Sequence, residues 1–168
     1  TLNSHKGIYS TIWSAHAERI NYLIRVSDET EVNTIIIDVK DGGVYIDDHI
    51  KNLVIKLHEK NIYAIARLVV FQDGSQIKNH PEWYFKKADG SLWQDKRGWY
   101  WMNPSNHKVW EYNAIIAKKA IDAGFDEQNF DYIRYPSDGN MKDASYTLST
   151  GSKVDQLEKF FQYLHEQL

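Results

Sequence analysis

The sequence predicts a single α/β domain with parallel strands over residues 1–168, and three observations support this. Strand-like and helix-like segments alternate along the chain, a pattern typical of parallel strands joined by crossover helices. Residues 34–37 form a continuous β-branched run, as in a strand that is covered on both faces. The second and fourth predicted strands end in charged residues, and ligands of this fold class bind at the carboxyl ends of strands.

The first predicted strand covers residues 6–13, most of which are β-branched or aromatic. Ser14 follows as the expected N-cap of a helix whose apolar residues between positions 17 and 24 share one face. We expect this helix to end near Thr30.

The second predicted strand covers residues 34–41. Three charged residues gather at its carboxyl end: Asp38, Lys40 and Asp41. Asp47 or Asp48 is expected to cap the next helix, and Asn61 suits the left-handed position that ends it.

The third predicted strand, residues 62–71, is apolar nearly throughout and carries one charge, Arg67. Because a buried arginine needs an acidic partner, we expect Arg67 to pair with Asp38 or Asp131. Residues 72–103 then form a long irregular stretch that is rich in tryptophan, and long loops inside compact domains are usually functional or disordered.

The fourth predicted strand lies within residues 124–136, after a helix that opens at 103–105 and is closed by Gly124. Strand alternation places Asn129 and Asp131 on one face. A polar loop follows, and then a last amphipathic helix, whose apolar face is expected to comprise Val154, Leu157, Phe161, Leu164 and Leu168.

The composition excludes several classes of protein. Twenty basic and 23 acidic residues are well mixed, so no basic face for nucleic acid is expected. Cysteine is absent, which excludes disulfides and zinc–thiolate sites, and no apolar run approaches the 18 residues of a membrane span. The seven histidines lack HxH or HExxH spacing, so we expect no metal and no cofactor. Because the chain begins at Thr1 rather than Met, we expect a processed protein or part of a longer one.

One specific sequence motif occurs at the fourth predicted strand: Asp131-Tyr132-Ile133-Arg134-Tyr135-Pro136. Four less specific motifs are Lys6-Gly7-Ile8-Tyr9, Ile37-Asp38-Val39-Lys40-Asp41, Ile65-Ala66-Arg67-Leu68 and Trp101-Met102-Asn103-Pro104. In these motifs and their order, the chain resembles, over nearly its whole length, a family of bacterial glycoside hydrolase barrels that is distantly akin to the alpha-amylase clan.

This resemblance implies a (β/α)₈ TIM-barrel type of fold, of which the chain supplies the first four βα units, since a complete barrel needs about 250 residues. It also implies that Asp131 takes the position of the nucleophile at the end of the fourth strand. A glycosidase needs two carboxyl groups. The second is expected at Asp41 or outside this chain, and Asp126, at the other end of its strand, is expected to be structural.

The residues expected to bind substrate are Asp38, Lys40, Arg67, Trp93, Trp101, Asn103, Arg134 and Tyr135. Each has an alternative structural role. The charged residues at the end of the second strand could equally line a substrate cleft or form a salt-bridge network. Arg67 is expected to orient a neighbouring carboxylate. Arg134 is expected either to orient Asp131 or bind substrate, or to anchor a loop. The aromatic alternatives, stacking on sugar or packing in the core, apply to Trp13, Trp93, Trp99 and Trp101.

The leading hypothesis is therefore a glycoside hydrolase-like domain that acts on a polysaccharide or oligosaccharide, outside the cell or in the cell envelope. The first alternative is a non-catalytic glycan-binding domain, and the second is a metal-dependent deacetylase. Carbohydrate is the expected partner. A true half-barrel would leave two strand edges unpaired, so we expect it to form a homo-oligomer or to cover those edges with its Trp-rich loop.

Overall fold

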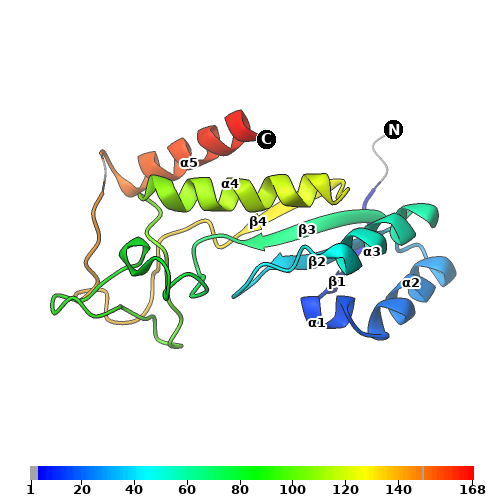
Figure 1. Cartoon of the computed structure of the whole chain (residues 1–168), viewed down its shortest axis with the longest axis horizontal. Coiled ribbons are helices and arrows are strands. Elements are labelled where there is room, and N and C mark those ends of the chain that lie inside the picture. Colours follow the sequence, from blue (N-terminus) through cyan, green and yellow to red (C-terminus); the bar gives the residue numbers. More distant parts are fainter. Residues whose placement is uncertain (1–3, 149) are drawn as a thin grey trace. The chain divides into compact units, whose positions relative to one another are not determined.

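The computed structural model describes residues 4–148 and 150–168, in which parallel strands alternate with helices (Figure 1). The four strands pair in the order β1-β2-β3-β4, so each strand lies beside its neighbour in sequence. They are β1 (Gly7–Ser10), β2 (Thr34–Lys40), β3 (Tyr63–Val69) and β4 (Glu127–Asp131). This is the arrangement of four consecutive βα units of a TIM-barrel type of fold, as predicted.

The register of the strands brings polar residues of β2 and β3 together. β1 pairs with β2 from Gly7 opposite Thr34, and β2 pairs with β3 so that Asp38 lies opposite Arg67. The pairing shifts register between Asp38 and Lys40, a bulge-like irregularity at the carboxyl end of β2. Bulges of this kind occur often beside functional sites, because they change the direction of the side chains that follow.

The first strand is shorter than predicted. It ends at Ser10, and Trp13 belongs to the short helix α1 (Ile12–Ala15), which corrects the boundary at residue 13. Ser14 is inside this helix and is not its cap: the Thr11 hydroxyl oxygen accepts a hydrogen bond from the Ser14 amide at 3.2 Å. Burial of two apolar side chains of α1 stabilises this turn against the β-propensity of the segment.

The next two helices confirm the predicted caps. Helix α2 (Arg19–Glu29) ends at Thr30, and α3 (Asp48–Glu59) begins after Asp47, whose carboxylate accepts from the Ile50 amide at 2.9 Å. Asn61 follows α3 with a φ of 58°, the left-handed conformation expected of it. Helix α4 (His107–Asp122) is closed by Gly124, whose φ of 93° favours glycine.

The chain divides into two compact units, which are described separately here. The first contains the residues up to Leu68 together with Ala117–Asn129, and the second contains Val69–Ile116 and the residues from Phe130 onward. The prediction of one domain over residues 1–168 stays a prediction.

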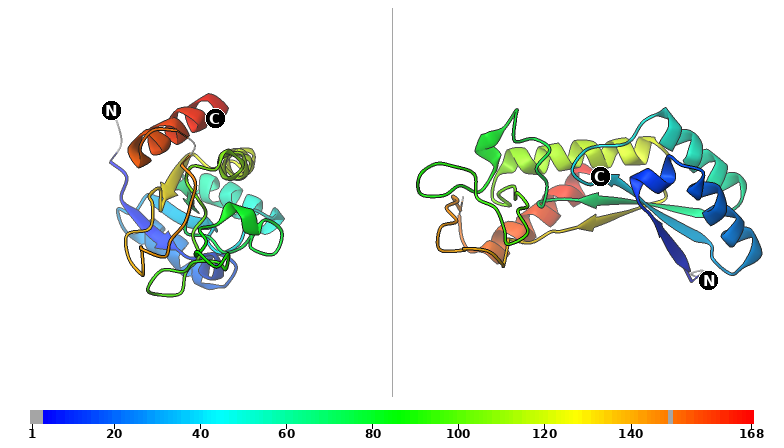
Figure 2. Two further views of the ribbon diagram at one scale, coloured as in Figure 1. Left: turned by 90° about the vertical axis from the view of Figure 1, so that its left-hand side faces the viewer. Right: turned by 90° about the horizontal axis from the view of Figure 1, so that it is seen from below.

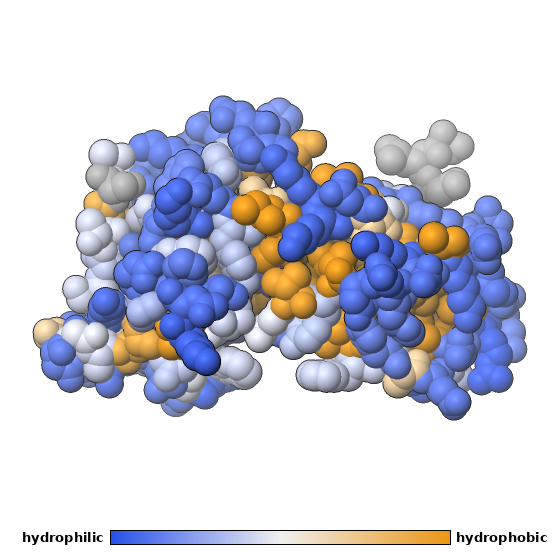
Figure 3. Space-filling model, viewed as in Figure 1, coloured by the Kyte–Doolittle hydropathy of each residue, from blue (hydrophilic) through white to orange (hydrophobic). Residues whose placement is uncertain are grey.

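The core of the first unit lies between the strands and helices α2 and α3, which run along one side of β1, β2 and β3 (Figure 2). β2 is buried at every position except Ile36, as predicted for a strand that is covered on both faces, and one stripe of each helix is buried. The fully buried side chains include Ile35, Ile37, Val39, Ala64, Ala66, Leu68, Ile50 and Leu57. The outer surface near α2 and α3, to the right in Figure 3, is largely hydrophilic.

The core of the second unit is aromatic and is built mainly by the irregular stretch 72–103, in which one short helix, η1 (Pro81–Trp83), is formed. The buried cluster includes Phe71, Trp83, Tyr84, Phe85, Trp93, Trp101, Trp110, Tyr135 and Phe160. The long loop is therefore ordered by burying its own rings, and most of its tryptophans are core residues.

The last helix, α5 (Lys153–Gln167), buries only part of the predicted face: Leu164 is buried as expected, but other members of that face are exposed. Val154 is 72% exposed and Phe161 53% exposed, whereas Gln156 and Phe160 are buried. The Phe160 ring lies 5.0 Å from that of Phe71, and this contact selects the buried stripe. Among residues 4–148 and 150–168, no helix has the length and apolarity of a membrane span.

Candidate functional site

In the first unit, the carboxyl ends of the strands hold a buried ion pair between Asp38 and Arg67. The Arg67 guanidinium donates to Asp38 Oδ1 at 2.7 Å, and the exposed fractions of the two side chains are 17% for Arg67 and 3% for Asp38. The Tyr9 hydroxyl donates to the other oxygen, Asp38 Oδ2. Of the two partners predicted for Arg67, the structure confirms Asp38.

Tyr9 connects this ion pair to the surface. Its side chain is 49% exposed, and the Arg67 guanidinium lies 5.8 Å from the centre of its ring. Burial of the hydroxyl group, together with its hydrogen bond to the Asp38 carboxylate, raises the pKa of Tyr9 to about 12. Tyr9 therefore stays protonated at neutral pH and keeps donating to Asp38. The sequence analysis did not single out this residue, although it ends the motif Lys6-Gly7-Ile8-Tyr9.

Two further charged residues lie at the carboxyl end of β2: Lys40 is its last residue, and Asp41 follows it. Lys40 is fully buried, and Asp41 is exposed in a tight turn in which its amide donates to the Gly43 carbonyl at 3.1 Å. Gly42 adopts a φ of 62° in this turn. Beyond the turn, Val44 pairs with Lys40 in an isolated antiparallel β-bridge. The turn thus fixes the backbone that carries the Asp41 carboxylate.

In the second unit, Asp131 ends β4 with its side chain half-buried. Its Oδ1 accepts a hydrogen bond from the Tyr132 amide at 2.7 Å, and its carbonyl accepts from the Val70 amide at 2.9 Å. Tyr132 has a φ of 55°, which is strained for a bulky side chain. Strain of this kind is concentrated at functional sites, and here it lies directly beside the Asp131 carboxylate.

Arg134 anchors the loop that follows β4. Its guanidinium lies 4.6 Å above the ring centre of Trp101 and donates to the Ser137 hydroxyl at 3.2 Å and to the Tyr135 carbonyl at 3.3 Å. These contacts favour the loop-anchoring alternative for Arg134.

The remaining predicted substrate-binding residues of this unit hold the loops together. Trp93 and Trp101 are 1% and 0% exposed, so neither ring offers an open face to a sugar, and burial favours the core-packing alternative for both. The Tyr135 hydroxyl lies 2.6 Å from the Ser105 hydroxyl, and burial raises the pKa of Tyr135 despite this bond. The Asn103 amide group donates to the Thr147 carbonyl at 2.9 Å.

Asp95 organises the Trp-rich loop, although the sequence analysis missed it. Its Oδ2 accepts from the Trp101 indole at 2.9 Å, and its Oδ1 accepts from the amides of Arg97 at 2.9 Å and Trp99 at 3.0 Å. Burial opposes ionisation of Asp95, but these hydrogen bonds outweigh it and hold its pKa below the usual value. The available signal was local: an Asp two residues before Arg97-Gly98 is typical of a turn in which the carboxylate accepts from the backbone.

We expect Asp95→Asn to lower the free energy of unfolding at pH 7 by roughly 1.5–3 kcal/mol, the usual value of hydrogen bonds to a charged group. Because the folded pKa is depressed, the stabilisation by Asp95 is complete above the unfolded pKa of about 3.9 and is lost as pH falls through the folded pKa. Urea unfolding between pH 7 and pH 3 checks both points.

The matched control is Asp89→Asn, since Asp89 caps an exposed turn and also has a lowered pKa. The control is expected to unfold like the parent protein at pH 7. A similar loss in both variants would contradict the central role of Asp95 in its loop.

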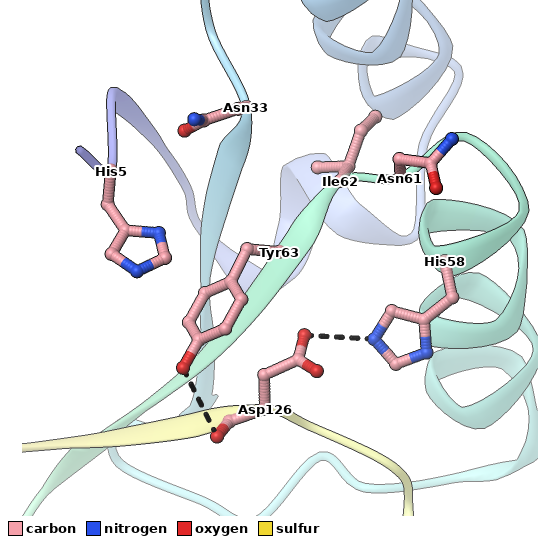
Figure 4. Close-up of a pocket in the computed structure, with 7 residues that line it drawn as sticks. All are labelled: His5, Asn33, His58, Asn61, Ile62, Tyr63 and Asp126. Atoms are coloured by element: carbon pink, nitrogen blue, oxygen red, sulfur yellow. Dashed lines mark hydrogen bonds and ion pairs between the residues drawn. The ribbon is translucent and has the colours of Figure 1, made fainter. Parts of the chain in front are cut away.

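The amino ends of the strands carry a cavity of about 290 Å³ in the first unit (Figure 4). Its lining residues are His5, Asn33, His58, Asn61, Ile62, Tyr63 and Asp126. The Asp126 carboxylate lies 2.9 Å from His58 Nε2 and accepts from the Ala64 amide at 2.8 Å, so it ties α3 to β3. These contacts support the structural role expected of Asp126.

Within the described ranges, no group of three or more histidine, aspartate and glutamate side chains is arranged to hold a metal ion. The side chains of His16, His58 and His107 are exposed.

Comparison with known proteins identifies the family of this chain. The family described as "Putative glycosyl hydrolase domain" matches residues 7–168. A crystal structure of a hypothetical protein from Ruminiclostridium thermocellum ATCC 27405 is similar to the chain with 31% identity and a TM-score of 0.86, over 96% of this chain and 92% of that chain. No curated protein sequence matches.

More distant structures share the fold. The chain is similar to the alpha-galactosidase from Lactobacillus brevis, with 14% identity, a TM-score of 0.62 and coverage of 98% of this chain and 24% of that chain. It is also similar to the maltogenic alpha-amylase AmyB from Thermotoga neapolitana, with 15% identity, a TM-score of 0.59 and coverage of 95% and 43%. The chain thus spans less than half of these TIM-barrel enzymes. The structural neighbours of the chain include glycoside hydrolases of the alpha-amylase clan and related barrels, and by its match over residues 7–168 the chain belongs to the family described as "Putative glycosyl hydrolase domain".

Proposed function

We propose that this domain hydrolyses glycosidic bonds and that Asp131 is its nucleophile or general base. The observation that carries the proposal is a half-buried carboxylate at the carboxyl end of the fourth strand, in a chain of a glycosyl hydrolase family. Barrel enzymes place their catalytic groups at this end of the strands. The hydrogen bond from the strained Tyr132 amide supports the proposal, because it orients the carboxylate.

The second carboxylate of the reaction is assigned to Asp41 or to residues beyond this chain. Asp38 is less suited to acid–base chemistry, because Arg67 and Tyr9 already occupy its two oxygens. We therefore assign Asp38 and Arg67 a positioning role at the end of β2 and β3. Lys40, Asn103 and Tyr135 stay predictions for substrate contact, whereas the contacts of Trp93, Trp101 and Arg134 favour their alternative roles in core packing and loop anchoring.

The test is the release of new reducing ends from glycans by the purified chain. We choose maltohexaose and the α-galactoside raffinose, because the fold neighbours include an enzyme named for each class, and oligomers of galactosamine, because the neighbour Ega3 of Aspergillus fumigatus was solved in complex with galactosamine. Cleavage of at least one substrate is the expected result, and the absence of product from all of them, with protein that is folded, contradicts hydrolysis.

A non-catalytic glycan-binding domain is the second candidate. The ion pair at Asp38 favours it, because it neutralises one of the carboxylates at the strand ends. This candidate predicts saturable binding of a glycan without product, which calorimetry and the reducing-end assay distinguish together.

A further inference from the structure

The exposed Trp13 and the half-buried Tyr45 form an aromatic pair at the carboxyl ends of β1 and β2, within the first unit. The Trp13 side chain is 73% exposed, and no other large hydrophobic side chain in the described part of the chain is more exposed. The centres of the two rings lie 6.0 Å apart, and their planes are inclined by 60°. An indole with this exposure has an open face, which costs free energy in water unless something covers it.

Both rings are held by a fixed backbone. Trp13 lies in α1 between the buried side chains of Ile12 and Ala15, so the helix cannot turn its indole inward without exposing them. Tyr45 follows the turn after β2, and its amide donates to the Val39 carbonyl at 2.9 Å. Its hydroxyl group lies against Gly43, where an added Cβ would come within 2.8 Å of the hydroxyl oxygen. The pair is therefore preorganised for a ligand.

We propose that this pair, which we call the Trp13–Tyr45 platform, binds a hexopyranose ring through the ring's apolar C–H face. The proposal deepens the proposed function and rests on it, since it places a sugar-binding subsite beside β1 and β2. An indole suits this ligand because a sugar presents an apolar C–H face that packs on the indole ring, while its hydroxyl groups stay in water.

The charge beside the platform selects among hexoses. Asp41 is exposed in the same turn as Gly43, against which the Tyr45 hydroxyl lies, so its carboxylate stands beside the platform. The positive charge of Arg67 is already engaged by Asp38. A negative field favours a neutral or amino sugar over a sugar acid, because like charges repel.

The test is an NMR titration of the ¹⁵N-labelled chain, in which the six tryptophans give six indole N–H signals. Trp13→Phe assigns the Trp13 signal. The probes are galactose, which is neutral, galactosamine, which carries a cationic amino group, and galacturonate, which carries an anionic carboxylate. The Trp13 signal is expected to shift saturably with the first two, with galacturonate binding at least severalfold more weakly. The indoles of Trp93, Trp101 and Trp110 donate to Asn140, Asp95 and Pro104 and serve as internal references.

Variants test the contact itself. Trp13→Ala is expected to weaken galactose binding about tenfold, and Trp13→Phe less, since a smaller ring keeps part of the stacking. Tyr22→Ala is the matched control, because Tyr22 is 45% exposed on α2 and lies in the same unit. Binding in this control should equal that of the parent chain.

Two outcomes overturn the proposal. One is a Trp13 signal that none of the sugars shifts. The other is a Trp13 signal that responds to protein concentration instead, which means that a second copy covers the ring. If the chain cleaves glycans but no sugar shifts the Trp13 signal, the platform alone is overturned. If sugars shift the Trp13 signal but no glycan is cleaved, the hydrolase function is overturned and the platform is kept.

Discussion

Asp131→Asn is expected to lower kcat/KM for glycan hydrolysis by roughly a thousandfold or more, because a carboxamide can neither attack the anomeric carbon nor accept a proton. The substitution is nearly isosteric. Asparagine keeps an oxygen that can accept from the Tyr132 amide, so the geometry at the end of β4 should be preserved. A loss of turnover with an unchanged thermal melting curve then reports on chemistry rather than on folding.

Glu127→Gln is the matched control for this variant. Glu127 begins the same strand, and strand alternation places it on the same face as Asp131, but at the opposite end. The hydrolysis rate of the Glu127→Gln variant should equal that of the parent chain. If Asp131→Asn also keeps the parental rate, Asp131 is neither nucleophile nor base, and if the parent binds glycans without cleaving them, the glycan-binding alternative holds.

Asp38→Asn is expected to produce the largest loss of stability, about 3–5 kcal/mol in the free energy of unfolding, as found when one member of a buried ion pair is removed. The Asp38 carboxylate is 3% exposed and accepts from both Arg67 and Tyr9. Without its charge, the Arg67 guanidinium remains largely buried beside a neutral amide. Urea unfolding at pH 7 measures the effect.

Two further variants separate burial from charge pairing. Lys6→Ala removes one partner of an ion pair with Glu31 in the same unit, where both side chains are well exposed, and should cost under about 1 kcal/mol. The double variant Asp38→Leu, Arg67→Met should recover much of the stability lost in Asp38→Asn, because apolar residues carry no desolvation cost. A loss in Asp38→Asn as small as that in Lys6→Ala would show that the pair is not effectively buried.

Local chemistry explains why much of the fold was predictable. The α3 cap at Asp47, the left-handed Asn61 and the closing Gly124 each depend on a residue type that a short backbone feature requires. The partner of Arg67 was predicted to be one of two carboxylates, because an arginine in an apolar strand needs a carboxylate on a neighbouring strand, and the structure shows a pair with Asp38. These features depend on contacts between residues that are close in sequence or that lie on adjacent strands.

The errors have a common origin in contacts between distant segments. The β-branched run to residue 13 predicted a strand, but the short helix α1 forms because Ile12 and Ala15 are buried there. In α5, apolar residues occur on two adjacent stripes, and Phe160 lies on the buried one because its ring packs against Phe71 and Trp110. Asp95 was missed because its partner Trp101 has a fixed position only after the loop has folded.

The sequence by itself determined the order of the elements, the parallel strands and the charged residues at their carboxyl ends, because periodicity and caps are properties of short segments. Only the tertiary structure decided what those residues are free to do. It buried Trp93 and Trp101 in a core and left Trp13 open, since the exposure of a ring depends on every segment that packs around it. It also engaged Asp38 with Arg67, because partner choice depends on the register between strands.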